Sequence, residues 1–140
     1  MADNSITVVG NVTRDPELRF ANSGTTIAKF SVAVSRKRGD TEVTSFFDVS
    51  CFGSLAQNVA SSLTKGIRVI VEGTLEQRTW ETETGDKRSK IEILANSVGT
   101  ELRWAKATVE RNPRPEGGSS DRPAPRAAEP SYNNFDEEPF

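Results

Sequence analysis

A segment of seven residues carries the aromatic rings best suited to stacking chemistry. Residues 46–52 read Phe-Phe-Asp-Val-Ser-Cys-Phe. Side chains of a strand alternate between its two faces, so one face would carry only core-like residues, Phe47, Val49 and Cys51. The other face would place two rings beside two polar groups, which are Phe46, Phe52, Asp48 and Ser50. Rings held on a solvent-facing sheet can stack on nucleobases, at about 1–3 kcal/mol for each base.

A third ring and a set of basic residues support this interpretation. Trp80 lies among polar residues at 77–82, where a buried tryptophan would be unusual. Six basic side chains flank the rings and are predicted to neutralise phosphates: Arg36, Lys37, Arg38, Arg78, Lys87 and Arg88. A basic cluster alone is usually a solvated surface, and one ring could instead cover an interface or a neighbouring strand. Interleaved, they favour a groove for single-stranded nucleic acid.

Composition argues against catalysis. The chain has no histidine and a single cysteine, Cys51, so the commonest general base is missing and no thiolate metal cluster is possible. No Gly-rich phosphate loop is present, and the carboxylates show no pairing that suggests acid–base work. We therefore expect a non-catalytic binding protein without a cofactor. The formal net charge of −2 gives no overall basic signal, but a groove can be positive on a neutral domain.

The C-terminal quarter differs in composition from the rest. Six of the seven prolines follow residue 110, and large apolar residues are almost absent from 111–134. Such a segment cannot offset its ordering entropy by burial, so we predict a disordered linker over 111–134. The chain then ends in an acidic, aromatic tip over 135–140, and its predicted partner-binding residues are Asp136, Glu137, Glu138, Pro139 and Phe140. This tip could dock into a basic-rimmed hydrophobic pocket of a partner, or it could be a solvated acidic end.

The remaining residues, 1–110, are predicted to form one all-β domain. Period-two alternation indicates five strands, near 6–12, 28–35, 43–52, 67–76 and 90–98. Leu55, Val59 and Leu63 recur at a spacing of four, which indicates a short helix over 54–63 with Ser54 as its N-cap. Five strands with a helix between the third and fourth match the element order of an OB-fold, a small Greek-key barrel. Other small β folds with one helix share this order.

Four motifs resemble the bacterial single-stranded DNA-binding protein family. The segments Gly10-Asn11 and Asp15-Pro16-Glu17-Leu18-Arg19 are similar to its opening "GN-x-x-x-DPE-x-R". Phe52-Gly53 before Leu55-Ala56 is similar to the "FG-x-LA" entry into its helix. Lys65-Gly66 with Val71-Glu72-Gly73 resembles its fourth strand, and the last five residues resemble its acidic "DD-x-PF" tip. Four motifs in the family's order make the resemblance specific over nearly the whole chain.

This resemblance implies an OB-fold homotetramer that wraps single-stranded DNA without sequence preference in replication, recombination and repair. The family's stacking aromatics fall on Phe46, Phe52 and Trp80. A further stacking tryptophan of the family aligns near Arg38, where this chain has no aromatic. The extension Glu101–Trp104 resembles the actinobacterial branch, in which an added strand reinforces the tetramer, and we expect Trp104 to be structural.

The resemblance also implies that the tip docks replication, recombination and repair proteins. It carries Glu137-Glu138 where the family usually has Asp and a small apolar residue. No signal peptide or apolar run long enough for a membrane span is visible, so we expect a cytoplasmic, nucleoid-associated protein. An alternative function is an OB-fold protein–protein adaptor in replication restart that binds DNA weakly.

Overall fold

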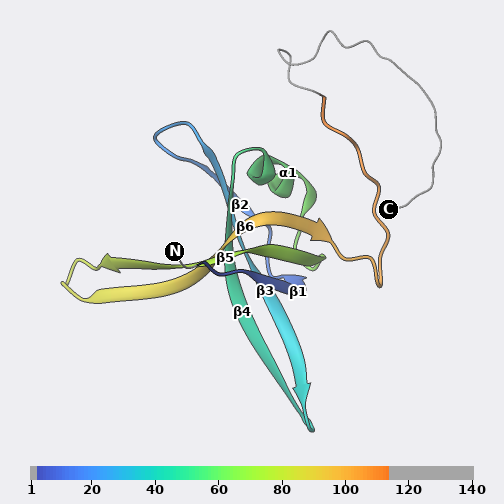
Figure 1. Cartoon of the computed structure of the whole chain (residues 1–140), viewed down its shortest axis with the longest axis horizontal. Coiled ribbons are helices and arrows are strands. Elements are labelled where there is room, and N and C mark those ends of the chain that lie inside the picture. Colours follow the sequence, from blue (N-terminus) through green and yellow to red (C-terminus); the bar gives the residue numbers. More distant parts are fainter. Residues whose placement is uncertain (1–2, 114–140) are drawn as a thin grey trace. The chain divides into compact units, whose positions relative to one another are not determined.

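A computed structural model describes residues 3–113 of the chain (Figure 1). Residues 1–107 form one compact unit, and a second unit begins at Thr108. Five long strands build the first unit: β1 (Ile6–Val12), β3 (Thr26–Arg38), β4 (Thr41–Phe52), β5 (Arg68–Glu81) and β6 (Lys87–Thr100). They neighbour one another in the order β1-β5-β6-β4-β3, and a β1–β3 pairing closes the ring. The predicted five-stranded OB barrel is therefore confirmed.

The pairing of strands follows from how they are connected. Tight turns at Gly39-Asp40 and Thr84-Gly85-Asp86 join β3 to β4 and β5 to β6 as antiparallel hairpins. The chain returns to the barrel through α1 (Ser54–Ser62), which lies between β4 and β5. This crossover lets β4 and β6 pair in parallel, with Val49 opposite Ile93.

Two details of the elements differ from the prediction. A short strand β2 (Glu17–Phe20) pairs with the start of β3, although its four residues are all exposed. The N-cap of α1 is Gly53 and not Ser54, which is the first helical residue. Gly53 has a φ of 70°, a conformation that costs glycine little, and its carbonyl oxygen accepts the first helical bond from the amide of Gln57.

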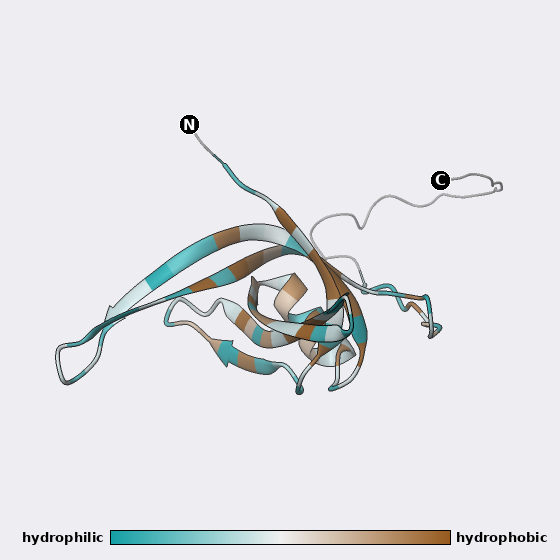
Figure 2. Cartoon of the chain, turned by 90° about the horizontal axis from the view of Figure 1, so that it is seen from below, coloured by the Kyte–Doolittle hydropathy of each residue, from teal (hydrophilic) through white to brown (hydrophobic). Residues whose placement is uncertain are grey.

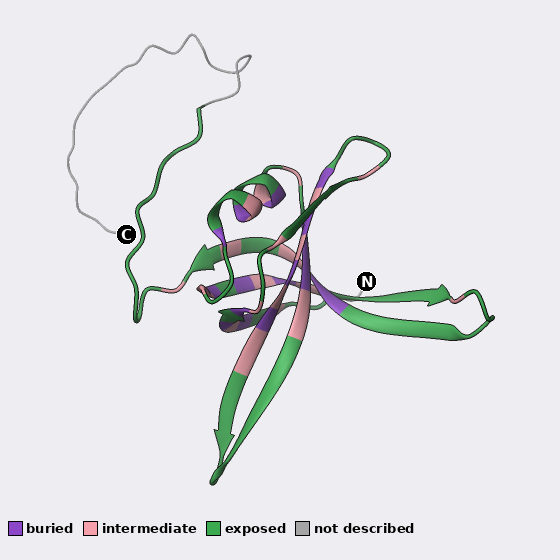
Figure 3. Cartoon of the chain, turned by 180° about the vertical axis from the view of Figure 1, so that it is seen from behind, coloured by how far each residue is buried: buried purple, intermediate pink, exposed green. Residues whose placement is uncertain are grey.

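The core forms from alternating apolar residues of the strands and one face of α1. Its largest fully buried side chains are Ile93, Val12, Val32, Val49, Val69, Val71 and Cys51. Val59 and Leu63 join them, as the helical spacing predicts. The predicted Leu55 is only partly buried, and Ala56 is fully buried instead. Figure 2 shows the hydrophobic segments of the strands around α1, and Figure 3 shows buried residues where the strands cross. The core is therefore built mainly by side chains of the strands, and α1 covers it mainly through contacts with β3.

Closure of the barrel depends on two glycines at points where backbones approach. A Cβ on Gly10 would lie 2.3 Å from the carbonyl oxygen of Ala33 on β3. A Cβ on Gly73 would lie 2.0 Å from the carbonyl oxygen of Leu94, beside the register shift between β5 and β6. Any larger residue at either position would force neighbouring backbones apart.

Both hairpins continue beyond the core as two-stranded arms (Figures 1 and 3). The strands therefore run farther than their hydrophobic alternation predicted, because cross-strand backbone pairs continue to Arg38–Thr41 and Glu81–Lys87. Residues 101–113 contain no helix or strand, so the added strand expected near Glu101–Trp104 does not form in this single chain. Residues 114–134 of the predicted linker and the tip Asp136–Phe140 lie outside the described residues.

Candidate nucleic-acid interface

The three predicted rings lie on one continuous face of the sheet. Phe46 and Phe52 are an even number of residues apart on β4, so they point to the same side. Trp80 on β5 is opposite Arg88 on β6, and Lys90, two residues further along β6, contacts Asp48 of β4. This contact joins the outer face of β4 to the outer face of the β5–β6 hairpin. We call this surface the stacking face.

All three rings of the stacking face reach solvent. Phe46 is 67% exposed, Phe52 47% and Trp80 45%. Two other rings serve the core, since Phe30 is buried in it and the partly buried Phe47 packs against it. None of the three rings of the stacking face belongs to the core cluster or is packed against it. They are available to bind flat, apolar ligands.

The predicted phosphate-binding residues divide between the two faces of the arms. Lys37, Arg78 and Arg88 share the parity of the rings, because Lys37 lies four positions from Ala33, the partner of Phe46, and Arg88 is the partner of Trp80. Arg36, Arg38 and Lys87 occupy the alternate positions and point to the opposite side. All six side chains are exposed. Only the first three are on the face that carries the rings.

Two carboxylates lie in the middle of the stacking face, and each is paired with a basic side chain. The Nζ of Lys90 is 2.7 Å from one oxygen of Asp48, and the hydroxyl of Ser31 donates to the other at 2.5 Å. Burial alone would raise the pKa of Asp48, but hydrogen bonds from Lys90 and Ser31 and the charges of Lys90 and Arg14 together hold it below its usual value. Asp48 is therefore ionised at neutral pH.

The second carboxylate, Glu92, is buried on the same face. The hydroxyl of Ser50 donates to it at 3.1 Å, and a guanidinium nitrogen of Arg78 lies 3.7 Å away. Ser50 was expected to be solvent-facing with the rings, but it is buried because β6 runs alongside β4 at this point. The Ser50–Glu92 bond satisfies two polar groups that would otherwise be buried without partners.

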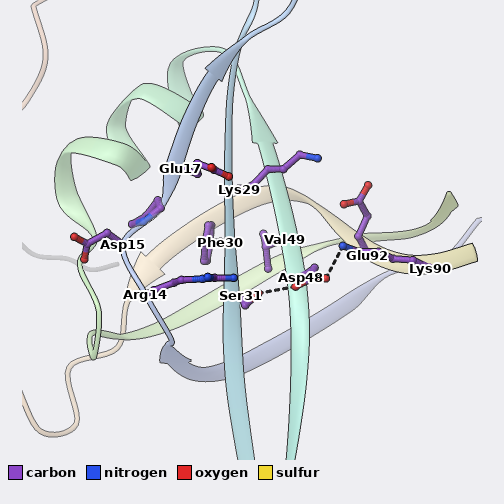
Figure 4. A pocket seen from close by; sticks show the side chains of 11 residues that line it. Arg14, Asp15, Glu17, Lys29, Phe30, Ser31, Asp48, Val49, Lys90 and Glu92 are labelled. Carbon is purple, nitrogen blue, oxygen red and sulfur yellow. Dashed lines mark hydrogen bonds and ion pairs between the residues drawn. The ribbon is translucent and has the colours of Figure 1, made fainter. Parts of the chain in front are cut away.

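A shallow pocket of about 440 Å³ surrounds these pairs (Figure 4). Its walls come from the connection between β1 and β2 and from β3, β4 and β6. The lining residues are Arg14, Asp15, Pro16, Glu17, Lys29, Phe30, Ser31, Asp48, Val49, Lys90 and Glu92. Sequence reasoning did not select Arg14 or Lys29 as site residues. Each is a single basic residue on an otherwise ordinary segment, and only the fold brings both beside Lys90.

Cys51 and Trp104 were expected to be structural rather than DNA-binding residues, and their surroundings are as follows. Cys51 is buried, and burial raises the pKa of its thiol to about 11, as expected for an inert core residue. Trp104 is exposed and lies against two guanidinium groups, those of Arg68 and Arg103, at 4.9 and 5.2 Å from its ring centre. Arg68 also bonds Glu101 at 2.7 Å, which fastens this segment to the start of β5.

The described residues, 3–113, contain no group of three metal-ligating side chains. None of the helices in the same range is long and apolar enough to cross a membrane.

Comparisons with known proteins point to one family. A family model described as the single-strand binding protein family matches residues 3–100. The chain is similar to proteins named single-stranded DNA-binding protein from three actinobacteria, the branch that the sequence indicated. It is 45% identical to the Corynebacterium glutamicum protein over 127 residues, which are 86% of this chain and 56% of that protein.

The other two alignments extend over more of the relative. Identity to the Mycobacterium bovis protein is 44% over 131 residues, covering 88% of this chain and 80% of the relative. Identity to the Mycolicibacterium smegmatis protein is 43% over 119 residues, covering 80% and 72%. The family match spans the whole barrel, including every ring of the stacking face. This chain belongs to the single-strand binding protein family.

Proposed function

We propose that this chain binds single-stranded DNA without sequence preference, in replication, recombination and repair. The observation that carries the proposal is the exposure of Phe46, Phe52 and Trp80 on one face of the barrel and its arm. Every base has an aromatic face, so stacking on these rings holds the strand whatever its sequence. The names of the relatives support this ligand.

The basic residues of the stacking face would supply the second part of the affinity. Lys37, Arg78 and Arg88 are on the same face as the rings and would neutralise phosphates. We propose Arg36, Arg38 and Lys87 as further phosphate contacts from the opposite side of the arms. No covalent step is needed for this function, and we propose that the protein is not an enzyme.

The first test is a titration of tryptophan fluorescence with oligo(dT). The chain has two tryptophans, so Trp104→Phe isolates the signal of Trp80. We expect strong quenching by oligo(dT), little by a duplex of equal length, and the same Kd as wild type. Absence of both quenching and a gel shift at low salt would contradict DNA binding by this face.

A second test separates the two faces of the β5–β6 arm. Arg88 and Lys87 are neighbours that point to opposite sides, and only Arg88 is beside Trp80. Each neutralised phosphate contributes about 0.7 to the slope of log K against log salt for single strands. We expect Arg88→Ala to reduce the slope by about this amount and Lys87→Ala to reduce it less. A larger loss for Lys87→Ala would place the strand on the other face.

We further propose that the tip Asp136–Phe140 recruits replication, recombination and repair proteins. Its acids would steer it to basic partners and Phe140 would anchor it. Deleting these five residues should leave oligo(dT) binding intact while binding to helicase or polymerase partners is lost. A different pair of results would favour the replication-restart adaptor instead. In that case the wild type would bind oligo(dT) only weakly, and the deletion would still abolish partner binding.

A homotetramer in the cytoplasm, associated with the nucleoid, completes the proposal. Ile70 of β5 is an exposed apolar residue directly opposite Val9 of β1, on the outside of the barrel. An apolar pair at this place fits a surface that a second copy covers. Sedimentation equilibrium should give four times the chain mass, and Ile70→Asp should lower that mass. A monomer at all concentrations would contradict the assembly.

A further inference from the structure

The ammonium group of Lys90 is already occupied by a carboxylate of the protein itself. It lies 2.7 Å from Oδ2 of Asp48, and Oδ1 of the same carboxylate accepts the hydroxyl hydrogen of Ser31 (Figure 4). Both oxygens of Asp48 therefore have a partner. The distance of 2.7 Å between the Lys90 ammonium and a carboxylate oxygen is also the distance at which an oxygen of a DNA phosphate would bind Lys90.

The pair lies on the path that a strand would follow between the rings. Asp48 is on β4 between Phe46 and Phe52, on their face. Lys90 is two residues from Arg88, the cross-strand partner of Trp80. A strand stacked on rings of both β4 and β5 would therefore pass over the Asp48–Lys90 pair.

The charge around this pair opposes a phosphate. Three cationic side chains line the pocket, together with four carboxylates. The net charge of the lining is thus −1, although the pocket is in the middle of a surface proposed to bind a polyanion. A backbone phosphate at this point gains a contact with Lys90 only by displacing Asp48.

The pair is open enough for such an exchange. The side chains of Asp48 and Lys90 are 43% and 41% exposed. Ion pairs of this exposure contribute little to stability because water and salt screen them. Breaking the pair would therefore unfold nothing, and Lys90 could turn to a phosphate.

We propose that Asp48 is an internal competitor of DNA for Lys90, which weakens the binding of single strands and speeds their release. This proposal rests on the proposed function of the stacking face. A role for Asp48 in positioning Lys90 for DNA would have the opposite sign, because removing the carboxylate would then weaken binding. The two roles are separated by a single substitution.

The test is the Kd for fluorescein-labelled oligo(dT), measured by anisotropy over a range of salt. We expect Asp48→Asn to lower Kd about fivefold at low salt, the effect of about 1 kcal/mol between two unit charges about 4 Å apart at the dielectric of water, which suits this exposed pair. Its salt slope should increase by about 0.7, for one more phosphate neutralised. Asp48→Glu should stay near wild type. Glu72→Gln is the control, since it removes the same charge outside the pocket lining.

Removing Lys90 tests the competition itself. In a Lys90→Gln background, Asp48→Asn should lower Kd by a smaller factor. It should no longer change the slope of log K against log salt. An equal gain without Lys90 would overturn the proposal, as would unchanged or weaker binding by folded Asp48→Asn. Circular dichroism checks that each variant is folded. Failure of the wild type to bind oligo(dT) would contradict the proposed function itself. This result is distinct from the outcomes for the Asp48 and Lys90 variants, all of which are compared with a wild type that binds.

Discussion

Replacing Trp80 by alanine should weaken DNA binding strongly while leaving the barrel intact. Trp80 is on the β5–β6 arm, outside the core, and nearly half of its surface is exposed. Its neighbour across the hairpin is Arg88, and cross-strand pairs contribute roughly 0.2–1 kcal/mol. We therefore expect the free energy of unfolding to fall by less than about 1 kcal/mol.

The loss in binding should be larger than this. One stacked base contributes about 1–3 kcal/mol, which corresponds to an increase in Kd of about 5- to 150-fold. The assay is the anisotropy of fluorescein-labelled oligo(dT), since the substitution removes the fluorescence of Trp80. Urea unfolding of the same samples gives the stability.

Ile91 provides a matched control on the same arm. It is 62% exposed and is paired with Gln77, so it points to the side opposite Trp80. Ile91→Ala removes a comparable exposed apolar side chain, and Kd should stay within about twofold, since no stack is lost. A wild-type Kd for folded Trp80→Ala, or an equal loss for Ile91→Ala, would refute the assignment of the stacking face.

Three further predictions follow from individual residues. The thiol of Cys51, with a pKa of about 11, should react with a disulfide reagent at pH 8 only after the protein is unfolded in urea. Gly10→Ala should lower the free energy of unfolding by about 1–3 kcal/mol, because its methyl group meets a backbone carbonyl oxygen, whereas Gly99→Ala meets nothing within 4 Å and should cost less than about 1 kcal/mol. A hydrogen bond from Arg68 holds the pKa of Glu101 below its usual value, so this contact stabilises the fold above the ordinary glutamate pKa and is lost as pH falls through the folded value. Carboxyl NMR should show Glu101 titrating below ordinary glutamates, and Arg68→Met should raise its pKa toward the usual value, with the remaining lowering due to the backbone amide and charge of Arg103.

The barrel could be predicted from the sequence because strands and helices leave local, periodic patterns of apolar residues. Alternation at 46–52 separated Val49 and Cys51, which are buried, from Phe46 and Phe52, which are exposed. The helix was recognised from apolar residues at a spacing of four, of which Val59 is fully packed. Faces of strands and helices follow from backbone geometry alone, so a single chain is sufficient to assign them.

Features that depend on contacts between distant strands were beyond this reasoning. The Asp48–Lys90 pair joins residues 42 positions apart, and nothing in either segment indicates the other. Burial of Ser50 and Glu92 results from the parallel pairing of β4 with β6, which only the crossover through α1 makes possible. Strand β2 was missed for a different reason. It has only four residues, and the alternation of Leu18 and Phe20 within it is too short to recognise.

The two-stranded arms have a consequence for the dynamics of this protein. Their outer parts have no core residues beneath them, so opening them breaks mainly backbone bonds between two strands. Regions of this kind open with a far smaller free energy than the barrel, and their amide hydrogens exchange with solvent correspondingly faster. Trp80 is on such an arm. A bound strand that lies across Trp80 and β4 would tie the arm to the barrel, and the amides of residues 79–90 should then be the ones that gain most protection from exchange.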